Sequence, residues 1–172
     1  MKLMPANDFE MVKTRYVTIC ENTPGIERYA RWVYGKHPTD DSLRSYIDNG
    51  EMYLLADEDD IVGMVVIIMH QGQDYERVPW TENLADDQIA TIHLLAVCPA
   101  YQGKGFGRKI LEEAVSFAKR KGKKSIRLDI LKSNLPAQRL YASAGFLFRG
   151  KQHLYAENTA WLDFLFYEKK LD

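Results

Sequence analysis

The first fifty residues of the chain carry hydrophobic positions at helical spacing. Asn7 and Glu10 have the form of a capping box, and apolar residues then recur every three or four positions until "NTPG" ends the pattern. The segment "GIERYARWVYGKHP" has room for a short second turn. Oxygens at residues 39–41 can cap a further helix, which the Asn49-Gly50 pair would end.

After Gly50 the pattern changes to apolar, β-branched runs, which indicate strands. "MYLLA" and "IVGMVVIIM" flank the acidic turn "DEDD" and predict an antiparallel hairpin. Residues 70–89 hold Gly, Pro, Trp and many acids without any period, so they predict a long loop, a kind of segment that is usually functional or disordered.

The second half of the chain predicts strands and helices in alternation. A strand at residues 90–97 precedes an amphipathic helix from Gly105 to Lys121, and the strand "SIRLDIL" follows. A helix with Pro136 near its start then leads to the strands "FLFRGKQHL" and "AWLDFLFYE". Because a strand-helix-strand crossover joins parallel strands, we expect one parallel pair within a mostly antiparallel sheet, in an α+β (mixed α/β) fold.

Composition limits the function classes. The 172 residues include 46% hydrophobic residues and show no linker or repeat, which predicts a single globular domain over residues 1–172. The formal net charge of −1 gives no global reason to expect nucleic acid or an anionic membrane as a partner. The longest apolar run, residues 61–69, is far shorter than the roughly 20 residues of a membrane span, so we expect a cytoplasmic protein. The cysteines and histidines are too scattered to predict a metal site.

The stretch "YQGKGFGRK" places glycines at 103, 105 and 107 directly before a predicted helix. The first turn of a helix leaves backbone N–H groups without partners, and bare glycines let an anion approach them. The spacing fits neither the Walker motif nor the dinucleotide fingerprint. The remaining pattern, Gln102-x-x-Gly105-x-Gly107 after a strand, therefore predicts a phosphate or pyrophosphate site of another kind.

Two motifs resemble those of the GNAT superfamily of N-acetyltransferases. "LAVCPAYQGKGFGRKIL" is similar to its acetyl-CoA motif, and "NLPAQRLYASAGF", about thirty residues later, is similar to its second element. The resemblance implies a mostly antiparallel mixed sheet of six to seven strands, with a splayed parallel pair at the CoA site and about four flanking helices. It also implies direct transfer of an acetyl group from acetyl-CoA to an amine, with no covalent enzyme intermediate.

The resemblance further implies where the co-substrate lies. Acetyl-CoA would occupy a V-shaped opening between the strand that ends at Val97 and the strand that contains residues 128–131. Strand backbone groups and Asn134 would bind the pantetheine arm, and the glycine loop would bind the pyrophosphate. The residues expected to bind acetyl-CoA are Leu95, Val97, Gln102, Gly103, Lys104, Gly105, Phe106, Gly107, Arg108 and Asn134.

Transfer to an amine needs a base, because only the neutral amine attacks a thioester. His93 is a candidate, since imidazole changes protonation near neutral pH, and arylalkylamine acetyltransferases carry a histidine at the matching position. Thr91 stands where other members place a glutamate base. A purely structural His93 is the open alternative, in which case Glu82, Asp86 or Asp87 could act through water.

Two further catalytic groups follow from the resemblance. Tyr141 matches the tyrosine that protonates the leaving CoA thiolate, although a buried aromatic on an amphipathic helix is its other interpretation. The backbone N–H of Leu95 would stabilise the tetrahedral oxyanion.

The acceptor is expected to be the amine of a small molecule or a peptide. Tyr75, Trp80 and Glu82 in the long loop could wall its site, and the acids Asp74, Glu76, Glu82 and Asp86 would suit a cationic acceptor. The length and aromatic content of the loop favour a small molecule. A non-catalytic acyl-CoA-binding or regulatory domain is the alternative function, and the sequence does not distinguish a monomer from a homodimer.

Overall fold

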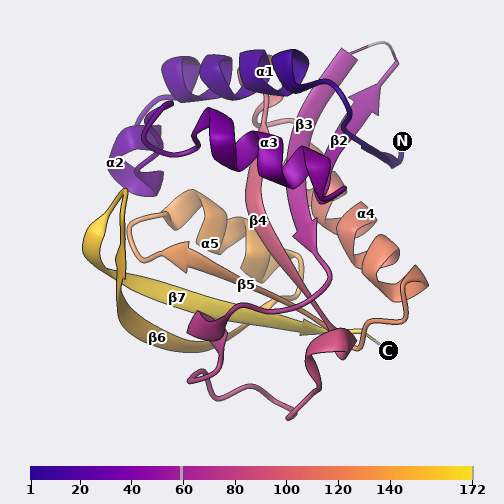
Figure 1. Cartoon of the computed structure of the whole chain (residues 1–172), viewed down its shortest axis with the longest axis vertical. Coiled ribbons are helices and arrows are strands. Elements are labelled where there is room, and N and C mark those ends of the chain that lie inside the picture. Colours follow the sequence, from indigo (N-terminus) through magenta and orange to yellow (C-terminus); the bar gives the residue numbers. More distant parts are fainter. Residues whose placement is uncertain (59, 172) are drawn as a thin grey trace.

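The computed structural model describes residues 1–58 and 60–171 and contains a seven-stranded sheet (Figure 1). The order is β1-β2-β3-β4-β5-β7-β6, and only the β4–β5 pair is parallel, as the sequence predicted. The acidic turn predicted at residues 57–60 includes Asp59, which lies outside the described residues. The strands are β1 (Leu3–Pro5), β2 (Met52–Asp57), β3 (Asp60–Ile68), β4 (Ile89–Val97), β5 (Ser125–Leu131), β6 (Leu147–Ala156) and β7 (Ala160–Lys170).

Five α-helices accompany the sheet in the described part of the chain, where about four were expected. The short second turn forms a helix of its own, which accounts for the difference. The first helix is capped by Asp8, whose Oδ1 accepts from the backbone N–H of Met11 at 3.0 Å, so the Asn7 capping box was wrong by one residue. None of these helices is long and apolar enough to cross a membrane. The helices are α1 (Phe9–Asn22), α2 (Ile26–Ala30), α3 (Asp40–Asp48), α4 (Phe106–Arg120) and α5 (Leu135–Ser143).

The helices cover opposite faces of the sheet (Figure 1). Helices α1 and α3 bury Tyr16 and Leu43 against residues of β2, β3 and β4 such as Met64. Helices α4 and α5 bury Leu111 and Tyr141 against the other face. This arrangement places the N-terminus of α4, with its glycines, beside the end of β4.

Strands β4 and β5 separate in the middle of the sheet. Their pairing runs from Ile89 with Ser125 to Ile92 with Leu128 and stops there. Beyond this point β4 contains a bulge, in which Leu94 and Leu95 together oppose Val65 of β3. Leu94 adopts a positive φ of 46°, and its carbonyl accepts a 2.6 Å hydrogen bond from the buried hydroxyl of Tyr16. The bulge therefore directs the end of β4 away from β5 and opens the sheet.

Candidate active site

A cavity of about 490 Å³ lies where β4 and β5 separate. It is bounded by the end of β4, the loop that enters α4 and the first turns of α5. Gly103 and Gly105 have φ values of 75° and 86°, and a Cβ atom added to either would meet nothing within 4 Å. Both glycines are thus required by backbone conformation and leave bare backbone facing open space.

Gly107 has a different role from these two glycines. Its φ is not in the left-handed region, and an added Cβ would lie 3.2 Å from Cδ2 of Leu140 and 3.6 Å from Cγ2 of Val97. The absence of a side chain at Gly107 thus allows α4 to pack closely on α5 and on the end of β4.

Nine of the ten residues predicted to bind acetyl-CoA line this first cavity. The exception is Lys104, whose Nζ lies 5.5 Å from the ring centroid of Tyr101. The Gln102 side chain donates to Oγ1 of Thr23 at 2.9 Å and to the Val97 carbonyl at 3.0 Å, so it closes the loop against α1 and β4. The nine lining residues are Leu95, Val97, Gln102, Gly103, Gly105, Phe106, Gly107, Arg108 and Asn134.

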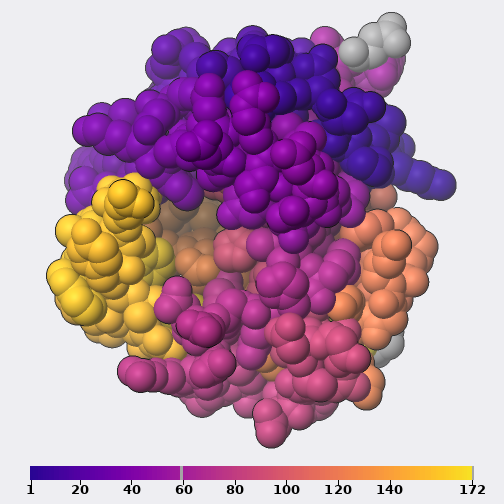
Figure 2. Space-filling model, in the orientation of Figure 1, coloured from indigo at the N-terminus to yellow at the C-terminus, as the bar shows by residue number. Residues whose placement is uncertain are grey.

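A second cavity of about 250 Å³ adjoins the first one. The two share Leu95, Asn134 and Tyr141 among their lining residues, so they meet at the splayed strands. On the face seen in Figure 2, the molecule is hollowed between the yellow β6–β7 hairpin, the purple helical segment and the magenta segment after β3. Ala156, Asn158 and Thr159 of this hairpin and Trp32 of the helical region line the second cavity.

Both predicted catalytic side chains reach the second cavity. Neither ring nitrogen of His93 has a hydrogen-bond partner among the described residues, so the structure does not show the satisfied histidine of the structural alternative. Burial raises the pKa of Tyr141, and the charge of Asp129 adds to this effect. The Tyr141 hydroxyl therefore stays protonated at neutral pH and can donate a hydrogen bond.

Asp129 and His37 also line the second cavity, and neither was identified from the sequence. Asp129 follows Leu128, the last residue of β5 that pairs with β4, and it lines the cavity where the two strands separate. Its Oδ1 accepts a 2.6 Å hydrogen bond from the hydroxyl of Tyr75. Burial lowers the pKa of His37 and His93 adds to the decrease, while Asp129 opposes it. A lone acid within the apolar run "SIRLDIL" was the available signal for Asp129.

Of the three predicted acceptor-site residues, only Tyr75 lines a cavity near His93. Tyr75 is buried and lines a third cavity of about 300 Å³, which also contacts His93 and Asp129. Trp80 stacks on Tyr75, with ring centroids 5.8 Å apart, and donates from Nε1 to the Tyr75 carbonyl at 2.7 Å. The carboxylate of Glu82 pairs with Lys170. Of the described residues that line the three cavities, none is Trp80 or Glu82.

The carboxylates offered as alternative bases lie apart from this centre. Oδ1 of Asp86 accepts from the backbone N–H of Gln71 at 2.9 Å, and the side chains of Asp86 and Asp87 are exposed. Within the described chain, neither residue lines any of the three cavities, whereas His37, His93 and Asp129 line the second cavity together with Tyr141.

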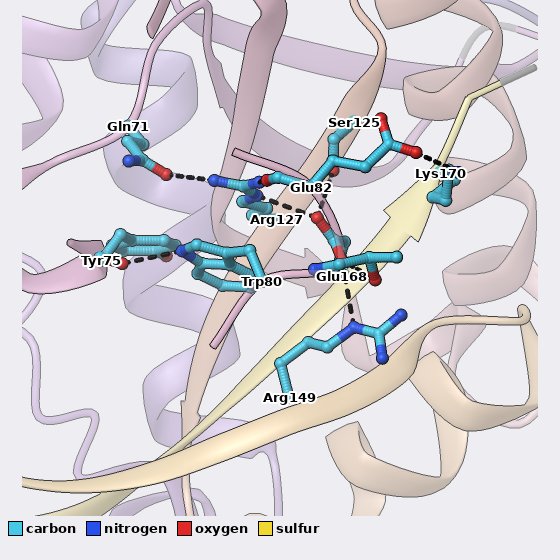
Figure 3. Close-up of polar contacts among 10 residues, drawn as sticks. Gln71, Tyr75, Trp80, Glu82, Ser125, Arg127, Arg149, Glu168 and Lys170 are labelled. Carbon is cyan, nitrogen blue, oxygen red and sulfur yellow. Dashed lines mark hydrogen bonds and ion pairs between the residues drawn. The ribbon is translucent and has the colours of Figure 1, made fainter. Parts of the chain in front are cut away.

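A buried ionic network fixes the long loop against the sheet (Figure 3). Arg127 and Glu168 are each 1% exposed, and their Nε and Oε1 atoms lie 3.1 Å apart. Arg127 also donates to Oε1 of Gln71 at 2.7 Å and to the Glu82 carbonyl at 3.1 Å. Its guanidinium lies 4.2 Å from the ring centroid of Trp80. Arg127 thus holds Trp80, which in turn packs on Tyr75 beside Asp129.

Within residues 1–58 and 60–171, no group of three or more His, Cys, Asp or Glu side chains is placed to hold a metal ion.

The sequence profile of the Acetyltransferase (GNAT) family matches residues 20–146, and the chain belongs to this family. The profile covers the splayed strands, the glycine loop and α5, so the resemblance inferred from the two motifs is confirmed.

Curated relatives with several acceptors are similar to parts of the chain. A [ribosomal protein bS18]-alanine N-acetyltransferase of Haemophilus ducreyi is 32% identical over 91 residues, which cover 46% of this chain and 61% of the relative. Streptothricin acetyltransferase of Streptomyces lavendulae is 34% identical over 74 residues, or 43% of this chain and 39% of the relative. The chain thus spans less than two thirds of the length of these relatives.

Solved structures show the same fold. A structure from Salmonella typhimurium, described as a putative acetyltransferase with its cofactor acetyl-CoA, has a TM-score of 0.70 at 22% identity, covering 100% of this chain and 94% of that one. A Bacillus subtilis acetyltransferase in complex with CoA has a TM-score of 0.69 at 18% identity and covers 99% of both chains. At such identities the likeness concerns the fold, and it confirms the predicted fold class.

Proposed function

We propose that the protein is an acetyl-CoA-dependent N-acetyltransferase that moves the acetyl group directly to the amine of a small molecule. The observation that carries this proposal is the first cavity, which combines a splayed parallel strand pair with two left-handed glycines at the start of α4. Pyrophosphate fits such a site because unpaired N–H groups and the helix dipole both favour an anion. The family membership and the CoA-bound neighbours support the same co-substrate.

The donor half of the reaction would use the first cavity. Backbone groups of Leu95 and Val97 and the side chain of Asn134 would bind the pantetheine arm, which places the thioester where the first and second cavities meet. The bulge supports an oxyanion role for the Leu95 N–H, because a bulge leaves backbone groups unpaired with the neighbouring strand. By its hydrogen bond to the Leu94 carbonyl, Tyr16 acts as a positioning residue for this bulge.

The acceptor half would use the second cavity. His93 would take the proton of the attacking amine, directly or through water, and its free ring nitrogens suit that role. As the tetrahedral intermediate collapses, the C–S bond breaks and the hydroxyl of Tyr141 would donate to the leaving sulfur. The C–N bond forms as the C–S bond breaks, and passage of a proton from His93 to Tyr141 through solvent restores both groups, so the cysteines need no role.

The loop and the β6–β7 hairpin favour a small-molecule acceptor over a peptide. Tyr75, in the buried end of the loop, lines the third cavity, and Ala156, Asn158 and Thr159 of the hairpin line the second. A peptide needs an open groove for its extended backbone, whereas these two cavities have volumes of only about 300 and 250 Å³. The peptide amine remains the second acceptor class to be tested, because one of the relatives is named for a ribosomal protein.

Calorimetric titration with acetyl-CoA, followed by a thiol-release assay over a panel of amines, tests this function. Binding with thiol release for a small-molecule amine is the expected result. Binding without release for any amine would instead support the non-catalytic acyl-CoA-binding alternative. The absence of binding would overturn both functions.

Gly105→Leu is expected to weaken acetyl-CoA binding at least about tenfold, because its side chain would occupy the space over the N–H groups of α4 and remove charge-assisted hydrogen bonds. Calorimetry measures the change. Gly50→Leu is the matched control, since Gly50 also has a positive φ, 69°, and open space around it, but lies at the end of α3. Equal affinity of the two variants for acetyl-CoA would contradict the assignment of the glycine loop.

His93→Ala is expected to lower turnover about tenfold or more at neutral pH while leaving acetyl-CoA affinity unchanged. The deficit should shrink as pH rises toward the pKa of the amine, about 10, because the amine then reaches the site already neutral. Turnover rates measured across this pH range, at saturating acetyl-CoA, provide the test. Full activity of the variant at neutral pH would assign His93 a structural role only.

A further inference from the structure

The second and third cavities meet at Asp129. Both are lined by His93, Asp129, Ala156 and Phe164, whereas the first cavity, next to the glycine loop, is lined by none of these residues. The opposite end of the second cavity shares Leu95 and Tyr141 with the first. An acceptor whose amine reaches the proposed transfer point therefore extends its remaining atoms toward Asp129.

The charge of this acceptor region is one-sided. Asp129 lines both the second and the third cavity, Asp74 lines the third, and among the described lining residues of the two cavities there is no Lys or Arg. The fixed charges of such an enclosed site attract a cation and repel an anion. An acceptor that carries a carboxylate would find no Lys or Arg among these residues, and only a protonated histidine, His37, His70 or His93, could offset its charge there.

Asp129 is held in place by its partners on one side. Its Oδ1 accepts from Tyr75, and its Oδ2 has no hydrogen-bond partner among the described residues. Tyr75 is fixed by its stacking on Trp80, over which Arg127 lies. Because these contacts already order the Asp129 carboxylate, this side chain loses little conformational entropy when a ligand binds to it. Figure 3 shows the residues that support Tyr75.

We propose that Asp129 binds a second ammonium group of the acceptor, so that the substrate is a compact molecule with two or more amino groups, such as a diamine or polyamine. One amine would be acetylated near Leu95 and Tyr141, and the other would lie against Oδ2 of Asp129. Apolar lining residues, including Ile92, Ile130 and Phe164, suit the methylene chain between them. This inference rests on the proposed acetyltransferase function.

The test compares two amines of equal length, 1,5-diaminopentane and 1-aminopentane, in the thiol-release assay with the full chain. The wild-type protein is expected to favour the diamine by about tenfold or more in kcat/KM, the effect of one charge-assisted hydrogen bond. Asp129→Asn keeps an acceptor oxygen for Tyr75 but removes the charge, and it is expected to bring this ratio close to one. Acetyl-CoA affinity, measured by calorimetry, should stay unchanged in the variant.

Glu157→Gln is the matched control, because Glu157 is an exposed acid in the β6–β7 turn beside cavity-lining residues. This variant should retain the preference for the diamine. If Glu157→Gln also lost this preference, a specific role for Asp129 would be overturned. An equal loss of activity toward both amines in Asp129→Asn would also overturn the proposal and assign Asp129 to proton transfer. If the wild-type protein acetylates amines but does not prefer the diamine, the role of Asp129 is refuted and the acetyltransferase function stands. If no amine gives thiol release, the proposed function itself is refuted.

Discussion

Tyr141→Phe is expected to lower turnover about a hundredfold, because the variant cannot donate to the leaving sulfur as it gains charge. The aromatic ring should remain in place. It packs edge-on against Phe146, with centroids 5.7 Å apart, and phenylalanine preserves that contact. Burial and the charge of Asp129 raise the pKa of Tyr141, so the wild-type hydroxyl carries its proton throughout the neutral range. Single-turnover thiol release at saturating acetyl-CoA measures this step.

The matched control for this variant is Tyr167→Phe. Tyr167 is also buried and lies in the same aromatic cluster, with its ring centroid 6.5 Å from that of Tyr141. It is absent from the described residues that line the three cavities, so its variant should keep wild-type turnover. If Tyr141→Phe were equally active, or if its defect appeared only as weaker acetyl-CoA binding, the proton-donor role would be refuted.

The strands, helices and glycine loop were predictable because their signals are local. The run "SIRLDIL" coincides with β5, and the glycines at 103 and 105 permit the left-handed backbone that the loop adopts there. The order of the strands in the sheet was harder to predict from the sequence. β7 lies between β5 and β6, an arrangement set by which strands can bury their faces together rather than by any single segment. β1 has only three residues, too few to show a period.

The side chains that complete the candidate site come from elements distant in sequence. Tyr75 and Asp129 are hydrogen-bonded across 54 positions, and Tyr16 and Leu94 across 78. Each appears in the sequence as an ordinary loop, strand or helix residue, and only the folded chain brings the pairs together. Trp80 illustrates the same limit: it was expected at the acceptor site, but the buried Arg127 draws its ring toward β5. Two charged residues in one strand, Arg127 and Asp129, were the sequence signal for these contacts.

Arg127→Met is expected to reduce the free energy of unfolding by about 2–3 kcal/mol, because the buried Glu168 loses one of its two cationic partners. Arg149 remains, with its Nε 3.0 Å from Oε2 of Glu168, so part of the buried charge stays compensated. Urea denaturation followed by tryptophan fluorescence measures the loss. Lys151→Met, which removes an exposed partner of Asp163, is the control and should cost less than about 1 kcal/mol.

The pH dependence of stability gives this prediction a second readout. Burial alone would raise the pKa of Glu168, but hydrogen bonds from Thr81 and Ser125 and the charge of Arg127 outweigh it, so the pKa lies below the ordinary 4.5. A carboxyl group with a lowered pKa stabilises the fold above its ordinary value and loses this contribution as pH falls through the folded value. Wild-type stability should therefore decline below about pH 4.5, whereas Arg127→Met, in which burial is less opposed, should decline at higher pH. Identical pH profiles would show that Arg127 does not stabilise the charge of Glu168, and Arg127 would then act through its contacts with the loop, at Gln71, Trp80 and Glu82.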